Sequence, residues 1–290
     1  MADREPNALP CATDESRSTA PAFMDLEVPD YAYMFGFLQA DGHLSKGTGQ
    51  KGRVSVELSA RDVGILREFQ RLTPYNSSII GRTRTTNFAA SHESSIWTLC
   101  ALEARTKLNE LGLPYGRKSE NIAPPRVPFS QRDYLRGVID ADGSVGYTSK
   151  GLPFVSLTTA STYIADYLST YATEVTGAER ILKRNARDNI YNIMYSMEAG
   201  QSLAAHLYYP SCLALERKRA AANSLADWAR PPGMRAAYTQ RRWTENEDRI
   251  LLEHAGPTAA AQALDRTPQS CSLRLWRLRN GMIPLPRDGE

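Results

Sequence analysis

The stretch YMFGFLQADG at residues 33–42 returns as YLRGVIDADG at residues 134–143, an offset of 101 residues (134 minus 33). Internal repetition is considered first because it sets the architecture of the whole chain. Each stretch carries a glycine and an alanine four positions apart, and residues at that spacing share one face of an α-helix. These small pairs are Gly36 with Ala40 and Gly137 with Ala141. We therefore predict two helices that pack closely side by side.

The repeat extends past both helices with the same offset. Alternating apolar and polar residues at 53–59 and 154–159 predict half-buried strands, and helical segments are expected next at 62–72 and 163–175. Each copy then has two further strand candidates and a closing helix. In the first copy they span 78–85, 94–100 and 102–111, and in the second they span 180–184, 190–197 and 199–207. The predicted fold class is α/β, with the element order αββαββα occurring twice.

Each motif helix ends in an aspartate that precedes a glycine. If the helices pack side by side, Asp41 and Asp142 lie at adjacent C-terminal ends, where the helix dipole disfavours a carboxylate. A bound cation offsets that repulsion, and paired carboxylates beside a phosphate suit Mg²⁺, which assists phosphodiester hydrolysis. The alternative is that Asp-Gly serves only as a helix stop and turn. Two copies in one context favour the metal site.

Both motifs resemble the paired motifs of LAGLIDADG homing endonucleases of the single-chain, two-repeat type, over roughly residues 25–225. The resemblance implies two pseudo-symmetric repeats whose strands form a saddle on double-stranded DNA. It also implies that Mg²⁺ binds Asp41, Asp142 and the backbone near Ala40 and Ala141, with Mn²⁺ or Ca²⁺ able to substitute for binding. The expected activity is a double-strand break at a long DNA site.

The resemblance further implies a catalytic lysine late in each repeat. Lys118 lies 77 residues after Asp41, and Lys218 lies 76 residues after Asp142, so the two copies agree within one residue. An ammonium group at this place would polarise water or stabilise the pentavalent phosphate. The alternative for each lysine is a solvated basic turn.

Two features differ between the copies. The first motif has Gln39 where the second has Asp140, and we expect this difference to affect packing at the helix end more than catalysis. Glu57 and Arg61 resemble residues that order water in relatives, whereas the second copy has threonine at both equivalent positions. Structural ion pairing is an equally good interpretation of Glu57 and Arg61.

Strand alternation turns every second side chain toward the DNA in a saddle of this kind. The candidate contacts are Arg53, Ser55, Arg82, Arg84, Lys183, Arg184, Arg187 and Asn189. Arginine bonds bidentately to guanine, whereas serine is more permissive. The alternative is a solvated sheet face with incidental charge.

A basic segment ends the chain. From residue 230 to residue 290 there are ten arginines and seven carboxylates, an excess that equals the net charge of +3 of the whole chain. Residues 241–281 predict three short helices: Thr244 with Glu247 forms a capping box, and Thr267 before Pro268 starts the last helix. The segment is similar to Myb-like helix-turn-helix domains.

This second resemblance implies that the last helix enters the major groove. The residues expected to touch DNA are Gln269, Ser270, Arg274 and Arg277. Trp243 and Trp276 are expected to fill the small core. Tethering such a module would raise its effective concentration at flanking sequence and add specificity without new chemistry. The alternative is a helical cap docked on the second repeat.

Hydrophobic residues make up 42% and charged residues 23% of the chain, which excludes a disordered or fibrous protein. The four cysteines are scattered and form no zinc or disulfide pattern, which fits a reducing compartment. The N-terminus has neither a secretory signal nor a membrane span, so we expect an intracellular monomer in the cytoplasm, on the nucleoid or in an organelle. The predicted divisions are a disordered tail 1–24, repeats 25–125 and 126–229, a linker 230–240 and the helix-turn-helix domain 241–281.

These inferences point to a site-specific homing endonuclease that cuts both DNA strands with Mg²⁺, assisted by DNA contacts from the C-terminal domain. A non-cleaving relative, either an intron RNA maturase or a transcriptional regulator, is the alternative. The presence of both aspartates and both late lysines favours the nuclease. An intein endonuclease is disfavoured because no self-splicing blocks flank the repeats.

Overall fold

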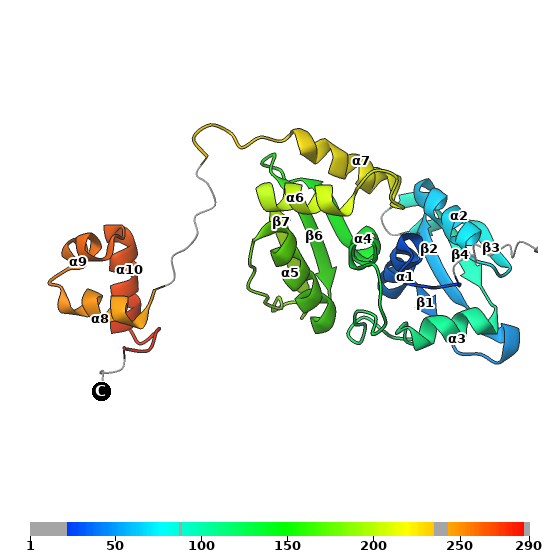
Figure 1. Ribbon diagram of the computed structural model, residues 1–290, viewed down its shortest axis with the longest axis horizontal. Helices are drawn as coiled ribbons and strands as arrows, with labels where there is room; N and C mark the ends of the chain where they lie inside the picture. Colours follow the sequence, from blue (N-terminus) through cyan, green and yellow to red (C-terminus); the bar gives the residue numbers. More distant parts are fainter. Residues whose placement is uncertain (1–21, 87–88, 235–242, 287–290) are drawn as a thin grey trace, which may run out of the picture. The chain divides into compact units, whose positions relative to one another are not determined.

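The computed structural model describes residues 22–86, 89–234 and 243–286. The chain divides into two compact units, Met1–Arg230 and Pro231–Glu290, and each is described by itself (Figure 1). Of the tail predicted at 1–24, residues 1–21 lie outside the described residues. Met24 is buried, and Phe23 packs edge-on against Tyr31 and Tyr75. These apolar contacts place residues 23–24 in the core of the first unit, so this end of the predicted tail is ordered.

Two packed helices form the centre of the first unit, α1 (Pro29–Asp41) and α4 (Gln131–Asp142). A Cβ atom on Gly36 would lie 2.2 Å from the carbonyl oxygen of Tyr134. Reciprocally, a Cβ on Gly137 would lie 2.1 Å from the carbonyl oxygen of Tyr33. Only glycine permits so close an approach of two backbones. The prediction that the two motif helices pack side by side is confirmed.

The first half of this unit has the predicted order αββαββα. After α1 come β1 (His43–Leu44), β2 (Val54–Ser59), α2 (Val63–Leu72), β3 (Ser77–Thr86), β4 (Ala89–Leu99) and α3 (Leu102–Glu110). The strands form an antiparallel sheet in the order β1-β2-β4-β3. Val54, Val56, Trp97 and Leu99 turn into the core. Because side chains alternate along a strand, the residues between them form an outward face.

The second half has one strand fewer than predicted. After α4 come β5 (Gly143–Tyr147), β6 (Pro153–Thr159), α5 (Thr162–Thr176), β7 (Tyr191–Ser196), α6 (Glu198–Leu207) and α7 (Glu216–Ser224). The strands form a three-stranded antiparallel sheet, β5-β6-β7. The strand predicted at 180–184 is wrong, because only an isolated bridge joins Arg184 to Tyr191. Ile181 there is 78% exposed, so the segment lacks the buried face that holds a strand on a sheet.

The second unit contains the three helices predicted for it, α8 (Glu245–Glu253), α9 (Pro257–Leu264) and α10 (Pro268–Arg279). Thr244 and Glu247 form the predicted capping box at the start of α8. Trp243 packs against the core, as predicted, but Trp276 is 51% exposed, so its predicted place in the core is wrong. The core uses Leu275 and Leu278 of α10, and the helical period turns Trp276 outward.

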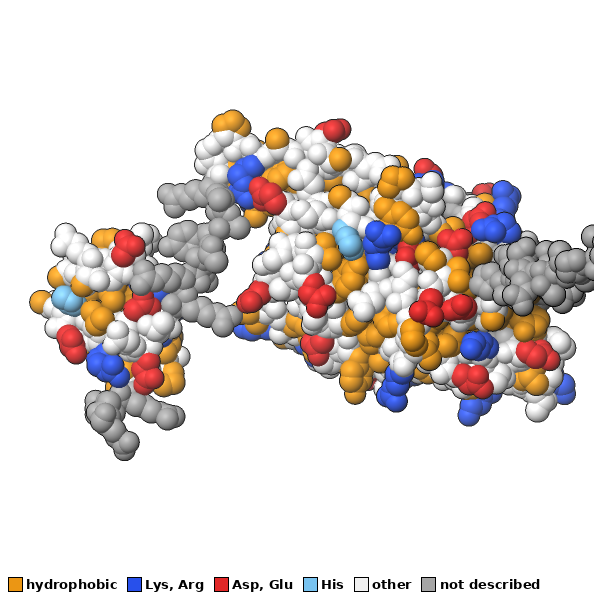
Figure 2. Space-filling view, in the orientation of Figure 1, with side chains coloured by type: hydrophobic (Ala, Val, Ile, Leu, Met, Phe, Trp, Pro, Cys, Tyr) orange, Lys and Arg blue, Asp and Glu red, His pale blue; other side chains and the backbone are white. Residues whose placement is uncertain are grey.

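Across the described ranges, no helix combines the length and the apolar character that crossing a membrane requires. Acidic and basic side chains are interspersed on the face of the first unit that Figure 2 shows. That face carries no large patch of one sign.

Candidate metal and nucleic-acid site

Asp41 and Asp142 are the last residues of the two central helices, and the structure brings them together. The close packing at Gly36 and Gly137 sets the two C-terminal ends beside each other. Ala40 and Asp142 line one small hollow of about 230 Å³, which shows that the helix ends share a surface. Both aspartates reach solvent, although protein atoms surround much of each carboxylate.

This setting makes the charged form of both aspartates unfavourable. Burial, and then the negative charge of Asp142, raise the pKa of Asp41 to about 6, while Lys118 and Lys218 oppose that rise. Burial also raises the pKa of Asp142. Two carboxylates at two negative helix ends repel each other, and a divalent cation between them would offset the repulsion.

Both predicted lysines lie at the site, and each binds the end of its motif helix. Lys118 Nζ donates to the carbonyl of Gln39 (2.6 Å) and also to that of Ala40. Lys218 Nζ donates to three carbonyls, those of Ile139 (2.7 Å), Asp140 (2.7 Å) and Gly143 (2.8 Å). The two ammonium groups therefore satisfy carbonyls that a helix C-terminus leaves unpaired.

The burial of these lysines perturbs their ionisation. Desolvation lowers the pKa of Lys118 to about 8, against the opposing charges of Asp142 and Asp41. Desolvation likewise lowers the pKa of Lys218 to about 8, with Asp140 as the largest opposing charge. Both side chains thus titrate close to neutral pH, where an ammonium group can both stabilise negative charge and exchange a proton.

Gln39 and Asp140, the pair that differs between the motifs, are buried at the helix ends. Asp140 accepts hydrogen bonds from the hydroxyls of Tyr33 (2.7 Å) and Tyr208 (2.6 Å) and from the backbone of Leu215 (2.7 Å). These contacts tie the end of α4 to the segment that leads into α7. Asp140 thus packs and anchors the end of its motif helix, as expected for this position.

Gln39 makes equivalent hydrogen bonds at the end of α1 in the first half. Its amide donates to the carbonyls of Gly112 and Ala123, both at 2.9 Å, and its oxygen accepts from the hydroxyl of Tyr134. The two tyrosines that reach across the helix pair, Tyr33 and Tyr134, were not predicted as part of the site. Their common offset of 101 residues was the signal that could have identified them.

The donor set at the helix ends fits Mg²⁺ that also binds a phosphate. Within the part of the chain that the structure describes, no three His, Cys, Asp or Glu residues cluster as a metal cage would require. Mg²⁺ is commonly held by one or two carboxylates, with waters and substrate phosphates as its other ligands. Asp41 and Asp142 would be the carboxylates of such a site. The carbonyl of Ala40, predicted as a nearby ligand, already accepts a hydrogen bond from Lys118.

The outward face of the first sheet adjoins Asp41. A hollow of about 480 Å³ there is lined by Asp41, His43, Arg53, Ser55, Glu57, Ile80, Arg82, Ile96 and Thr98. The predicted contacts Arg53, Ser55 and Arg82 are thus brought together beside the aspartate. Arg84 is exposed, and it forms an ion pair with Glu57. The hollow also contains His43, which the sequence interpretation missed although it follows the Asp-Gly motif directly.

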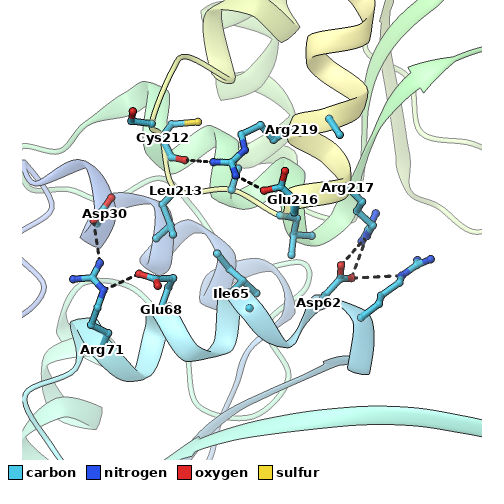
Figure 3. Close-up of a pocket in the computed structure, with 16 residues that line it drawn as sticks. Asp30, Asp62, Ile65, Glu68, Arg71, Cys212, Leu213, Glu216, Arg217 and Arg219 are labelled. Carbon is cyan, nitrogen blue, oxygen red and sulfur yellow. Dashed lines mark hydrogen bonds and ion pairs between the residues drawn. The ribbon is translucent and has the colours of Figure 1, made fainter.

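Glu57 and Arg61, predicted together as water-ordering residues, are separated. Glu57 lies in the hollow beside Asp41, but Arg61 lines a different hollow, of about 680 Å³, between α2 and residues 211–220 (Figure 3). They separate because β2 ends at Ser59 and the 3-10 helix Ala60–Asp62 carries the chain to the helical side. Both residues form the structural ion pairs expected as the alternative, Glu57 with Arg84 and Arg61 with Asp62, and the ordering of water stays a prediction. Charges in that hollow pair locally, for example Arg217 with Asp62 at 3.1 Å.

The predicted contacts of the second half do not lie on its sheet. Lys183 and Arg187 are exposed in the connection between α5 and β7, and Arg187 pairs with Asp188 at 2.7 Å. Asn189 has a positive φ of 54° in the same connection. Arg184 donates to the carbonyl of Ala160 at 2.9 Å and stacks over Tyr191, so these contacts hold its side chain against the protein, and its contact with DNA stays a prediction.

In the second unit, Gln269 and Arg277 are exposed on α10 and Ser270 is half-buried. Arg274 pairs with a residue of the same unit. Its Nε donates to Asp248 of α8 at 2.7 Å, and its side chain is only 17% exposed. This ion pair joins α8 to α10, which gives Arg274 a structural role, and its contact with DNA stays a prediction.

Residues 130–208 match the LAGLIDADG-like domain family. The LAGLIDADG-like match contains the second motif with Asp142 and runs from the start of α4 to the end of α6. No curated protein matches the chain in sequence.

Several solved structures are similar to the chain at low identity. A structure of the homing endonuclease I-WcaI bound to its DNA recognition sequence is 11% identical, with a TM-score of 0.47, covering 68% of this chain and 87% of that one. A structure of the meganuclease I-SmaMI bound to uncleavable DNA is 11% identical, with a TM-score of 0.46 and the same coverages. The LAGLIDADG homing endonuclease I-LtrWI bound to target DNA is 11% identical, with a TM-score of 0.40, covering 64% and 85%.

Proposed function

We propose that this protein is a site-specific homing endonuclease that makes a metal-dependent break in both strands of a long DNA site. The observation that carries the proposal is the meeting of Asp41 and Asp142 at abutting helix ends, each with a buried lysine on the same helix end. The match of residues 130–208 to the LAGLIDADG-like domain supports it.

Asp41 and Asp142 would hold Mg²⁺, with Mn²⁺ or Ca²⁺ able to replace it for binding. When bound, the metal would supply positive charge to the phosphate and to the attacking water. Lys118 and Lys218 keep two positive charges at the same helix ends, where they would stabilise the extra negative charge of the transition state. They also fix the helix ends, and thereby the positions of both carboxylates.

The outward sheet faces provide the surface for DNA. Arg53 and Arg82 line the hollow beside Asp41, Arg84 is exposed on β3, and all three would contact phosphates or guanines. The second unit would add contacts to flanking DNA through α10, with the exposed Gln269 and Arg277 as the candidates. This role rests on the three-helix core and on the cationic last turn of α10.

The experiment is a cleavage selection. The full-length protein is incubated with a library of random DNA sites and Mg²⁺, and the cut ends are sequenced. We expect one recovered site, cut in both strands. Asp41→Asn and Asp142→Asn should lose cleavage severely while still binding that site, because each substitution removes a charged ligand and almost no volume. A protein that binds one site but never cuts it, with Mg²⁺ or Mn²⁺, would be a non-cleaving regulator or maturase.

A further inference from the structure

The two sheets of the first unit differ in the chemistry of their strands. The first sheet has charged or titratable side chains, among them His43, Glu57, Arg82 and Arg84. Among the residues that form the second sheet, in β5, β6 and β7, there is no Asp, Glu, Lys, Arg or His. The basic residues predicted for this half lie in the connection between α5 and β7 instead. A ligand on the second sheet is therefore met by uncharged groups.

Alternation divides the residues of β6 and β7 between two faces of the second sheet. The inward residues pack under α5 and α6 and are buried: Val155, Leu157, Ile193 and Tyr195. The outward residues are exposed or half-buried: Phe154, Ser156, Thr158, Asn192, Met194 and Ser196. Met194 is 44% exposed, so it is the apolar side chain that the outward face presents most openly.

Met194 occupies a position equivalent to one beside the first aspartate. It pairs with Ser156 of β6, whereas Ser55, 101 residues before Ser156, pairs with Thr98 of β4. Met194 therefore corresponds to Thr98, which lines the hollow beside Asp41. A polar residue of the first half is thus replaced by a long apolar one in the second.

The neighbours of this methionine show the same change of chemistry. At the offset of 101 residues, Phe154 stands where the first half has Arg53, and Thr158 stands where it has Glu57. Phe154 is the diagonal neighbour of the methionine across the strand pair, a spacing that long side chains can bridge. Thr158 lines the hollow beside Asp142, so the outward face of the second sheet is continuous with the proposed metal site.

Resting on the proposed function, we propose that Met194 determines specificity in one half of the DNA site by contacting the 5-methyl group of a thymine. That methyl group is the apolar group that base pairs present in the major groove. The unbranched, polarisable side chain of methionine adapts its shape to such a partner. Because this sheet carries no charge, its contacts release no counterions from DNA. Recognition of this half-site therefore depends on thymine methyl groups, whereas Arg53 and Arg82 serve the other half-site through charge.

The test is binding to DNA in which deoxyuridine replaces thymidine, because this change removes only the methyl group. The full-length protein selects its site from a random DNA library by binding alone, in Ca²⁺. Thymines are then replaced in one half of that site at a time, and the affinity of each duplex is measured in Ca²⁺.

The variants are Met194→Ala, which removes most of the side chain, and Met194→Leu, which keeps it apolar. Leu102→Ala is the matched control, because Leu102 is 42% exposed on α3, outside both sheets. Circular dichroism establishes that each variant is folded.

Uracil in one half-site should weaken binding by the wild-type protein about fourfold for each methyl group contacted, the value for one buried methyl group. Met194→Ala should bind the thymine site about as weakly as the wild-type protein binds the uracil site, and uracil should then cost it less than about twofold. Met194→Leu and Leu102→Ala should keep the wild-type response. An affinity that uracil leaves unchanged, or a uracil effect that persists in Met194→Ala, would overturn the inference.

The outcomes also separate this inference from the proposed function. Methyl-dependent binding by a protein that cuts nothing with Mg²⁺ or Mn²⁺ would contradict the nuclease and support the role of Met194. Normal cutting of a site whose affinity is indifferent to uracil would remove only the role of Met194. A protein that selects no DNA site would overturn both.

Discussion

The position of Asp41 in the structure disfavours the ionised form of its carboxyl group. Its pKa is raised from 3.8 to about 6 by burial and by Asp142, so the native state holds this proton more tightly than the unfolded chain does. The protonated Asp41 carboxyl therefore stabilises the native state in full at pH values below 3.8. This stabilisation is lost as the pH rises through about 6. At neutral pH the protein without metal thus carries an unfavourable charge at the site proposed to bind the metal.

The first prediction concerns this charge. Ca²⁺ should raise the midpoint of thermal unfolding more at about pH 7.5 than at about pH 5, because protons compete with the cation for Asp41 below about 6. Without metal at about pH 7.5, Asp41→Asn should raise the midpoint by roughly 1–3 °C, a small gain because solvent screens the group. Thermal scans at both pH values measure this, with the exposed Asp166→Asn as control. Equal Ca²⁺ effects at both pH values would contradict the assignment.

The second prediction concerns Lys218, which is 4% exposed and holds three carbonyls. Lys218→Met keeps the length of the side chain but leaves those carbonyls unpaired, at a cost of about 1–3 kcal/mol in the free energy of unfolding. Both Lys218→Met and Lys118→Met should slow cleavage more than they weaken binding, since a transition-state contact appears in the rate. Urea unfolding and single-turnover kinetics measure the two effects.

The exposed Lys107→Met of α3 is the control for this prediction and should change stability by less than about 0.5 kcal/mol. A loss of affinity alone, with the cleavage rate unchanged, would identify the buried lysines as ordinary phosphate contacts.

Among the elements, the pair α1 and α4 determines how far apart the two aspartates lie. The helix α1 is buried along the whole of residues 31–39, because α4 covers one side and the sheet and other helices cover the rest. Its glycine faces the backbone of the partner helix. Any widening of this contact would separate the carboxylates as well as weaken the core.

The third prediction tests that contact. Gly36→Ala and Gly137→Ala each place a Cβ within 2.2 Å of a backbone oxygen, which no side-chain movement relieves. Each should destabilise the first unit by about 3 kcal/mol or more and reduce cleavage. Gly64→Ala is the matched control, because Gly64 lies in α2 with nothing within 4 Å of its Cβ position. It should stabilise by up to about 1 kcal/mol. Equal unfolding free energies for the three variants would contradict the packing argument.

At the scale of the whole molecule, each of the two units has its own hydrophobic core. The first unit buries its own apolar cluster, and the second is built on Leu251, Leu264 and Leu275. Among the described residues, none belongs to both clusters. Removal of the second unit should therefore leave the fold of the first intact.

The fourth prediction follows from this division. A chain truncated after Ala229 should still cut its core site but bind a longer duplex less tightly and with a shallower salt dependence. Each lost phosphate contact should reduce the log-log salt slope by about 0.9. Affinities for short and long duplexes at several salt concentrations measure this. Arg277→Ala is the point variant, since Arg274→Ala would break the ion pair with Asp248 and unfold the module. Equal slopes for full-length and truncated protein would make the second unit a cap or protein-binding module.

The sequence by itself determined the features that local periodicity encodes. The glycine spacing predicted the packed helices, alternation predicted most of the strands, and capping residues predicted the three helices of the second unit. Each of these signals lies within a few residues of the chain, where backbone geometry relates sequence spacing to direction. The two aspartates could be placed at one site because each ends a motif helix, and the glycine and alanine spacing identified the face through which the two helices pack.

Only the tertiary structure decided what the long polar side chains do. Lys118 binds a carbonyl 79 residues away, Arg274 pairs with Asp248 across two helices, and Arg61 faces away from Glu57. Residues 180–184 likewise do not form the predicted strand, because Ile181 is exposed and packs on no core. A flexible charged side chain takes the partner that the fold brings near, and no pattern along the chain specifies which partner that is.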